Sequence, residues 1–298
     1  MEKRRLGRTG LEVSALGFGG AEIGYQGVPF ETVEKLLSGA LSSGLNVIDT
    51  AECYNTSEEM IGRAISHRRK EFYLFTKCGH ASGFDLPDWD PVLLEKSIDR
   101  SLIRLRTDCV DLLQLHSCSE RVLRQGDVIA VLQRARDAGK TRFIGYSGDG
   151  QNALYAVNCG AFDTLQTSLS IADQEPIDLT LPAARANGMG VIAKRPIANA
   201  VWRHQTRPEG AYGLTYWDRL QELKYDFLRP EMGGAIGMAL RFTLSVPGVS
   251  TAIVGTTRPG RWRENADRLA AGPLSEEEFQ AIRARWHEAA QPDWVGQG

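Results

Sequence analysis

Short apolar runs alternate along this chain with longer amphipathic segments, a pattern that predicts strands followed by helices. Residues 31–43 carry apolar side chains at helical spacing, and Gly44 ends that segment. Val47 and Ile48 then form a short β-branched run, which is typical of a strand buried on both faces. Ser57, followed by Glu58 and Glu59, resembles the N-cap and acidic first turn of the next helix.

The same unit recurs along most of the chain. The pattern predicts strands at 13–18, 47–49, 72–76, 110–115, 142–146, 162–168, 190–193 and 250–254. It predicts further helices at 91–106, 127–138, 153–158, 179–186, 234–245 and 261–270. Residues 198–233 interrupt the rhythm with an irregular, aromatic-rich insertion.

Eight strands that precede helices predict an α/β fold, an (α/β)8 TIM barrel with parallel strands inside and helices outside. Residues 1–298 are then expected to form a single domain, since this length suits one barrel. Arg8-Thr9-Gly10 lies between apolar positions and predicts an N-terminal β-hairpin. Ser275-Glu-Glu-Glu278 is a capping box that predicts an extra C-terminal helix.

Charge and cysteine content narrow the class of protein. The net charge of −2 gives no electrostatic footprint for nucleic acid or an anionic membrane, so neither partner is expected. The first residues lack an apolar leader and no stretch reaches 18 apolar residues, which favours a cytoplasmic protein. The 5 cysteines include no CxxC pair, so we expect reduced thiols rather than disulfides or a zinc ribbon.

Four polar residues follow three successive predicted strands. Asp49 and Tyr54 share the loop after one strand, Lys77 ends the next, and His116 ends the third. Neighbouring strands of a closed barrel bring their carboxyl ends together, so these side chains are expected to meet in one pocket. Taken singly, each residue also has an ordinary structural interpretation. In the order given, these are a cap, a half-buried aromatic, a charge at the barrel rim and a core histidine.

Together the four residues suit chemistry on a carbonyl group. A free phenol has a pKa of about 10, so Tyr54 needs a nearby cation such as Lys77 to release its proton readily. Asp49 would keep a buried Lys77 charged. His116 would donate a hydrogen bond to the carbonyl oxygen. The set lacks an electron source, so a bound cofactor must supply a hydride.

Several motifs resemble the aldo-keto reductase family. They are the segment 5–14, the Asp-Thr-Ala-x-x-Tyr run from Asp49, the Thr76-Lys77 strand end, the run ending at His116, Gly255-Thr-Thr, and Glu264-Asn265. The resemblance implies an (α/β)8 barrel that uses NADPH to reduce aldehydes or ketones and binds it without a Rossmann domain. Indeed, Gly17-Phe-Gly-Gly20 lacks the third glycine of that fingerprint, at Glu22. The resemblance also implies that Tyr54 is the general acid, that Lys77 and Asp49 tune it, and that His116 orients the substrate.

The same resemblance assigns cofactor-binding positions. They are Ser147, Gln166, Lys194, Arg195, Gly255, Thr256, Thr257, Arg258, Arg261, Glu264 and Asn265. Two positions depart from the family pattern: Gly148 replaces an asparagine beside the nicotinamide amide, and Lys194-Arg195-Pro196 stands where many members have Tyr-Ser-Pro. A lysine stem or a guanidinium could cover the nicotinamide face instead. Arg258 and Arg261 could pair with a 2′-phosphate, which favours NADPH over NADH, although a solvated helix face is an equal alternative.

Aromatic residues in the predicted loops are candidates for the substrate pocket. They are Tyr25, Trp89, Trp202 and Trp217, together with Tyr212 and Tyr216 of the insertion. Aromatic side chains also pin long loops in place, and we weigh the two interpretations equally. Cys53 and Cys78 flank Tyr54 and Lys77 in sequence, so simple alternation would point their thiols away from the pocket.

Two other classes of protein compete with a reductase. A regulatory or sensor barrel would bind NADPH with slow turnover, but a pure binder has no need of the general acid. A metal-dependent hydrolase is disfavoured because the 5 histidines include no HxH or HExxH pair, so no metal is expected. The expected partner is a small carbonyl substrate, and the sequence leaves the oligomeric state open.

Overall fold

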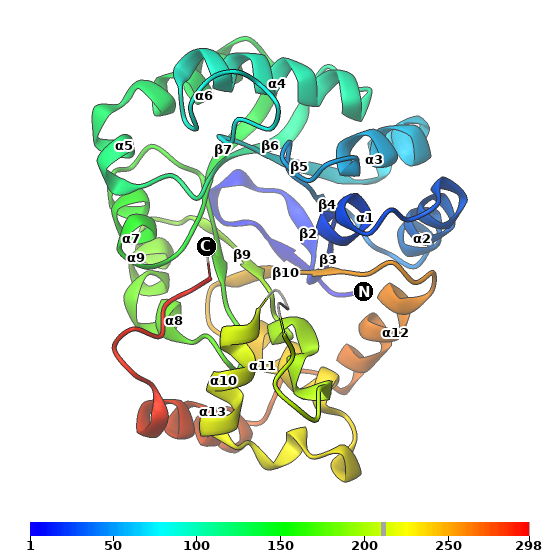
Figure 1. Ribbon diagram of the computed structural model, residues 1–298, viewed down its shortest axis with the longest axis vertical. Helices are drawn as coiled ribbons and strands as arrows, with labels where there is room; N and C mark the ends of the chain where they lie inside the picture. The colour runs from blue at the N-terminus through cyan, green and yellow to red at the C-terminus, as the bar shows by residue number, and fades with distance from the viewer. Residues whose placement is uncertain (210–212, 298) are drawn as a thin grey trace.

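The computed structural model describes residues 1–209 and 213–297 and contains a closed barrel of eight parallel strands (Figure 1). Around the barrel the strands follow chain order, and β10 closes it by pairing with β3. The strands are β3 (Leu16–Gly19), β4 (Val47–Asp49), β5 (Tyr73–Cys78), β6 (Val110–His116), β7 (Thr141–Ser147), β8 (Thr164–Ser168), β9 (Gly190–Lys194) and β10 (Val249–Gly255). The prediction of an (α/β)8 barrel is therefore confirmed.

Helices surround the strands, and most of them present an apolar face to the sheet (Figure 1). Those of the first half are α1 (Ala21–Tyr25), α2 (Phe30–Ser42), α3 (Ser57–Ile65), α4 (Pro91–Leu105), α5 (Glu120–Gln125), α6 (Asp127–Asp137) and α7 (Gly150–Asn158). Those of the second half are α8 (Glu175–Leu179), α9 (Leu181–Ala186), α10 (Leu214–Leu223), α11 (Ala235–Ser245), α12 (Arg261–Arg268) and α13 (Glu276–Ala289). The predicted capping box at Ser275 and Glu278 is present at the start of α13.

The predicted N-terminal hairpin plugs one end of the barrel. Strands β1 (Lys3–Arg5) and β2 (Glu12–Ser14) pair antiparallel, and Leu6, Leu11 and Val13 are buried among inward side chains of the barrel strands. A Cβ atom on Gly190 would lie 2.6 Å from Cγ of Leu6, so this glycine lets the hairpin approach β9 closely. With the amino end of the barrel filled, the carboxyl ends of the strands are left for a site.

Some predicted boundaries are wrong for identifiable reasons. The single strand expected at 13–18 is two strands. The first, β2, pairs with β1 in the hairpin, whereas β3 pairs with β10 and β4 in the barrel. Ser57 is not the N-cap of α3: Thr56 holds that position, and the Ser57 hydroxyl donates to the carbonyl of Gly20. Helices α1 and α5 were missed because both are too short to show a periodic pattern.

The insertion at 198–233 is more regular than expected. Its described part contains helix α10, whose Tyr216 and Leu220 join a second apolar cluster with Trp286 of α13. After α13 the chain turns back toward the barrel (Figure 1). In this segment the Val295 carbonyl accepts a hydrogen bond from Arg219 of α10 at 2.7 Å. This cluster therefore fastens the insertion and the C-terminal segment to one side of the barrel.

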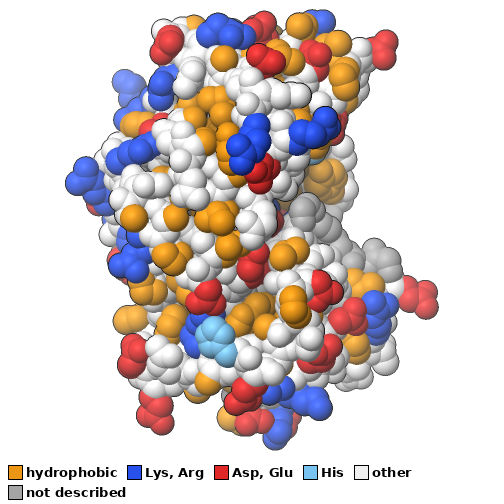
Figure 2. Space-filling model, turned by 90° about the vertical axis from the view of Figure 1, so that its left-hand side faces the viewer, with side chains coloured by type: hydrophobic (Ala, Val, Ile, Leu, Met, Phe, Trp, Pro, Cys, Tyr) orange, Lys and Arg blue, Asp and Glu red, His pale blue; other side chains and the backbone are white. Residues whose placement is uncertain are grey.

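The surface fits the charge balance of the sequence. On the face shown in Figure 2, acidic and basic side chains are interspersed rather than gathered into one field of a single sign. Among the described helices, none is both long and apolar enough to cross a membrane.

Candidate active site

The carboxyl ends of the strands surround a cavity of about 930 Å³. Of the residues singled out from the sequence, it is lined by Tyr25, Asp49, Cys53, Tyr54, His116, Ser147, Gln166, Lys194, Arg195 and Gly255. Lys77 lies directly beneath this lining, 1% exposed. The barrel therefore brings the four expected catalytic side chains to one place, from β4, β5, β6 and the loop after β4.

Asp49 and Lys77 form a buried ion pair at the floor of the cavity. The ammonium group of Lys77 donates to Oδ1 of Asp49 and, at 2.8 Å, to the carbonyl of Thr50. The other carboxylate oxygen of Asp49 accepts from the amides of Gln114 at 3.2 Å and Gln166 at 2.8 Å. Several hydrogen bonds on each partner hold both charges in fixed positions despite the burial.

Tyr54 lies between this ion pair and His116. The Lys77 ammonium is 5.2 Å from the centre of the Tyr54 ring, and the rings of Tyr54 and His116 are 5.8 Å apart at an angle of 77°. The turn that carries Tyr54 is fixed by its backbone N–H, which donates to the Ala51 carbonyl at 3.0 Å. The ring of Tyr54 thus lies beside a cation and beside an imidazole.

His116 is held as a neutral imidazole. Burial lowers its pKa well below the ordinary value, and the nearby charges of Lys77 and His80 lower it further. The carbonyl of His116 accepts from Nε1 of Trp89 at 3.0 Å, which fixes the end of β6. A neutral ring can donate one hydrogen bond to a ligand without changing the charge of the site.

Ser147 and Gln166 lie side by side on β7 and β8 and face the cavity. The Ser147 hydroxyl donates to Oε1 of Gln166 at 3.2 Å, and the Gln166 amide continues to Asp49. The structure also accounts for Gly148: a Cβ atom there would lie 2.6 Å from the Tyr146 hydroxyl. That hydroxyl is bonded to the Cys118 carbonyl at 2.6 Å, so Tyr146 fills the space that an asparagine at 148 would need.

Lys194 and Arg195 form a cationic wall at the end of β9. Lys194 pairs with Asp149 at 2.9 Å, and burial lowers the pKa of this lysine despite the pair. Asp149 also accepts from Thr167 at 2.9 Å and from the N–H of Ser168 at 2.6 Å. The guanidinium of Arg195 donates to the Ser168 hydroxyl at 3.0 Å and to the Gln297 carbonyl. Both long side chains are thus fixed beside the cavity.

Of the cofactor-binding positions expected between residues 255 and 265, only one lines the cavity. Gly255 lines it, whereas Thr256, Thr257, Arg258 and Asn265 do not, and Asn265 is buried. Arg261 is 3.3 Å from Glu264 in an ion pair within α12. A Cβ atom on Gly255 would lie 1.6 Å from Oε2 of Glu22, so a carboxyl group rests on this glycine. Burial raises the pKa of Glu22.

The aromatic candidates separate into two groups. Tyr25 lines the cavity, with its hydroxyl donating to the Cys53 carbonyl at 3.2 Å and its ring 5.7 Å from that of Tyr54. Trp89, Trp202 and Trp217 are not among the lining residues, and they instead fix loops or pack on the apolar clusters. Tyr216 is fully buried and bonded to Asp173. Tyr212 lies outside the described residues.

The sequence argument missed or misplaced several of the residues that line the cavity. Cys53 was expected to point away, but its sulfur is 3.4 Å from Nδ1 of His116. The alternation rule fails because β4 ends at Asp49 and Cys53 lies in the turn that follows. Glu22 and His80 also line the cavity. For His80, the position shortly after a strand that carries Lys77, one of the four expected catalytic residues, was a usable signal.

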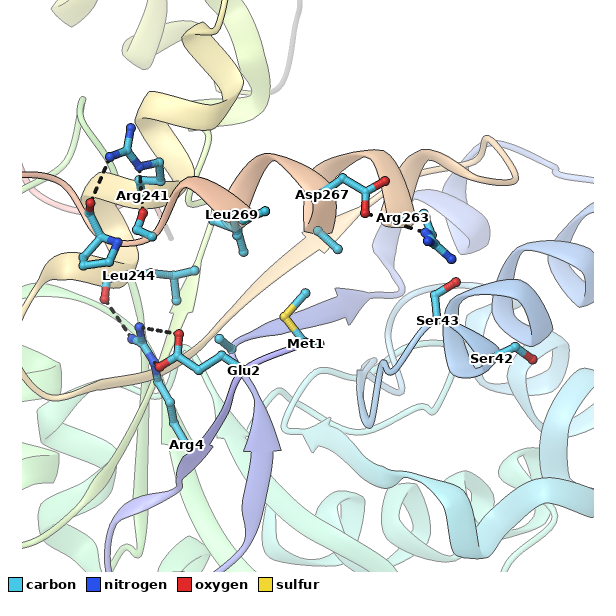
Figure 3. A pocket seen from close by; sticks show the side chains of 15 residues that line it. Met1, Glu2, Arg4, Ser42, Ser43, Arg241, Leu244, Arg263, Asp267 and Leu269 are labelled. Atoms are coloured by element: carbon cyan, nitrogen blue, oxygen red, sulfur yellow. Dashed lines mark hydrogen bonds and ion pairs between the residues drawn. The ribbon is translucent and has the colours of Figure 1, made fainter.

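A second cavity, of about 490 Å³, lies beside the N-terminal hairpin (Figure 3). Its three arginines already have partners: Arg4 pairs with Glu2, Arg263 pairs with Asp267, and Arg241 donates to the Gly272 carbonyl. The first cavity, which contains the expected catalytic side chains, is therefore the better candidate for the active site.

Comparison with known proteins gives a consistent result. A model described as "Aldo/keto reductase family" matches residues 15–287. L-galactose dehydrogenase of Arabidopsis thaliana is 31% identical over 281 residues, covering 89% of this chain and 87% of that protein. A putative voltage-gated potassium channel subunit beta of Schizosaccharomyces pombe is 27% identical, covering 88% and 86%. A solved aldo-keto reductase of Bacillus halodurans, in its holo form, has a TM-score of 0.81 and 28% identity and covers 98% and 99% of the two chains.

Proposed function

Because this chain belongs to the aldo/keto reductase family and is therefore an oxidoreductase that uses a nicotinamide cofactor, we propose that it reduces small aldehydes or ketones with NADPH. The observation that carries the proposal is the convergence of Tyr54, Lys77 and His116 at one cavity, with Asp49 bonded to the lysine. This set supports proton transfer to an oxygen atom rather than hydrolysis or simple binding.

The residues around the cavity fit a nicotinamide cofactor. Ser147 and Gln166 face the cavity and retain hydrogen-bonding capacity for a carboxamide beyond the bonds they already make. The aliphatic stem of Lys194 and the guanidinium of Arg195 offer a cover for a flat ring where other members have an aromatic side chain. Backbone amides of Gly255 to Thr257, ahead of α12, suit a pyrophosphate.

A reduced nicotinamide cofactor held by these residues would be the source of the hydride that the carbonyl carbon needs. His116 orients the substrate, donating its N–H to the carbonyl oxygen and favouring the charge that develops there. Tyr54 then gives its phenolic proton to that oxygen, and the Lys77 ammonium stabilises the phenolate left behind. Asp49 keeps the ammonium in place through the buried ion pair. The alcohol leaves, and a solvent proton restores Tyr54.

The preference for NADPH is a further part of the proposal. Arg258 is exposed at the start of the segment that leads into α12, and Arg261 is paired with Glu264. A 2′-phosphate would give both guanidinium groups a doubly charged partner, and Arg261 would then exchange Glu264 for it. NADH offers no such partner, so the arginines favour NADPH. The intracellular location expected from the sequence suits this cofactor and stays a prediction.

The test is a measurement of cofactor binding and consumption by the purified protein. We expect NADPH to quench tryptophan fluorescence, and small aldehydes and ketones then to consume NADPH in an absorbance assay. Because the Arabidopsis relative is named for L-galactose, the panel should include aldoses, assayed with NADP+ and NAD+ in the oxidative direction. Tight NADPH binding with no turnover across the whole panel would instead favour a regulatory barrel, a role that the name of the fission yeast relative illustrates.

A further inference from the structure

One cluster of side chains that line the cavity combines His116 with two residues that have no part in the reaction described above. Cys53 from the loop after β4, His80 from the loop after β5, and His116 at the end of β6 each bring one ligand atom within 4.8 Å of the other two. The sulfur of Cys53 lies 3.4 Å from Nδ1 of His116, and the rings of the two histidines are 5.0 Å apart. No short motif joins these residues, which is why the sequence did not suggest a metal.

The loop around His80 holds that ring in a fixed position. Nδ1 of His80 is 2.9 Å from Oδ2 of Asp88, and the other oxygen of Asp88 accepts from the N–H of Ala81 at 2.8 Å. The Trp89 ring packs 5.5 Å from the His80 ring and is itself bonded to the His116 carbonyl. Because Asp88 is hydrogen-bonded to Nδ1 of His80, Nε2 is the nitrogen available to bind a metal ion. Metal-binding histidines commonly have a carboxylate hydrogen-bonded to their other ring nitrogen.

We propose that Cys53, His80 and His116 form a binding site for Zn2+ or a similar transition metal ion, with Asp88 supporting His80 from behind. One thiol and two imidazoles are the ligands that Zn2+ prefers, and a fourth position toward the cavity is left for water. Mg2+ and Ca2+ are disfavoured because they require oxygen ligands. The ligand atoms need only close up slightly, since tetrahedral ligands about 2.0 to 2.3 Å from zinc lie between roughly 3 and 4 Å apart.

The site predicts a consequence for turnover, and this consequence rests on the proposed function. His116 is both a metal ligand and the expected hydrogen-bond donor to the substrate, and Tyr54 is 5.8 Å from it, ring centre to ring centre. A bound ion therefore occupies the space that the carbonyl group needs. Zn2+ is expected to inhibit competitively with the carbonyl substrate, while NADPH still binds.

The decisive test measures metal binding without any turnover. Co2+ is titrated into the full-length protein, and its absorption is followed in the near-ultraviolet, where thiolate coordination gives a charge-transfer band, and in the visible, where tetrahedral geometry gives intense bands. We expect saturation at one ion per chain and competition by Zn2+. The Cys53→Ser variant should lose the charge-transfer band, and Asp88→Asn should weaken binding by roughly tenfold or more.

Matched controls use residues of the same types elsewhere. Cys159 and His204 lie outside the cavity, so Cys159→Ser and His204→Gln should bind Co2+ as the unaltered protein does. Circular dichroism checks that Cys53→Ser folds, and His80→Gln gives a second route, with an expected loss of at least about tenfold in affinity. An unchanged charge-transfer band in Cys53→Ser, or no tetrahedral spectrum at saturating Co2+, would overturn the site. Because no substrate is present, this outcome is separate from any failure of the reductase assay.

Discussion

At the scale of single residues, a few close contacts fix the positions of the side chains in the proposed proton-transfer site. Asp49 makes bonds to Lys77, Gln114 and Gln166, so its charge is satisfied on both oxygens. The ion pair costs desolvation energy and is weak support for stability, but it fixes a cation beside the Tyr54 ring. The buried pair is thus better explained by its effect on the phenol than by its contribution to folding.

Glu22 leads to a prediction about cofactor affinity. Its carboxyl group rests on Gly255, where the proposed function places a pyrophosphate, so an ionised Glu22 should repel the cofactor. Glu22→Gln is expected to bind NADPH roughly tenfold more tightly at pH 8, or about 1.4 kcal/mol. Fluorescence titration measures this, with the exposed Glu34→Gln on α2 as the control.

The pH dependence of that effect has a definite sign. Because burial raises the pKa of Glu22, its carboxyl group takes up a proton at a higher pH than an ordinary glutamate does. The neutral form repels less, so the unaltered protein should gain affinity as the pH falls through this raised pKa, and the difference from Glu22→Gln should shrink. A difference that stayed constant while the pH fell from 8 through this raised pKa would rule out electrostatic repulsion as the cause.

At the scale of elements, the sequence predicted the strands and long helices well, because each has a clear hydrophobic period. It failed where an element is short or changes partners. The chain leaves the hairpin sheet at Ala15 and joins the barrel at Leu16, a switch that leaves no mark on the apolar pattern. Helix α10 also went unseen, because its apolar face packs against α13, far away in sequence.

The C-terminal helix offers a test of element stability. Ser275 and Glu278 form a reciprocal capping box, in which each side chain bonds the other residue's backbone N–H. Ser275→Ala is expected to lower the free energy of unfolding by about 1 kcal/mol, measured by urea denaturation. Ser42→Ala, at the exposed last residue of α2, is the matched control and should change it by less than about 0.5 kcal/mol.

A loss in the control as large as that in Ser275→Ala would mean that the cap makes no special contribution. An unfolding curve for Ser275→Ala that separates into two steps would show that α13 and its cluster with Trp286 unfold apart from the barrel. We expect a single step instead, because this cluster includes Ile171 and Ala172, which follow β8.

At the scale of the whole molecule, the closed barrel explains why the meeting of the four expected catalytic side chains could be predicted from the sequence. Strand order places β4, β5 and β6 side by side, so residues after their carboxyl ends meet although they are far apart in sequence. That rule was enough to predict Asp49, Tyr54, Lys77 and His116 at one cavity. It could not show where side chains beyond the strand ends point, and so Cys53 was misplaced, and Glu22 of α1 and His80 went unrecognised.

The hairpin and the loops divide the barrel into a closed end and a reactive end. Leu6, Leu11 and Val13 fill the interior at one end, and the cavity occupies the other. In the proposed function, the cofactor and the carbonyl substrate share the space between Lys194, Gly255 and Tyr54, which all line this cavity. This shared cavity makes both hydride transfer and proton transfer possible in a single bound complex.

The central claim, that Tyr54 is the general acid of a carbonyl reductase, is tested most directly by the turnover of Tyr54→Phe with NADPH and a saturating aldehyde. The variant lacks only the hydroxyl, so we predict a rate lower by at least about a hundredfold with an unchanged Kd for NADPH. Tyr155→Phe, on helix α7 outside the cavity, is the matched control and should keep its rate. Turnover of Tyr54→Phe within about threefold of the unaltered protein would contradict the claim.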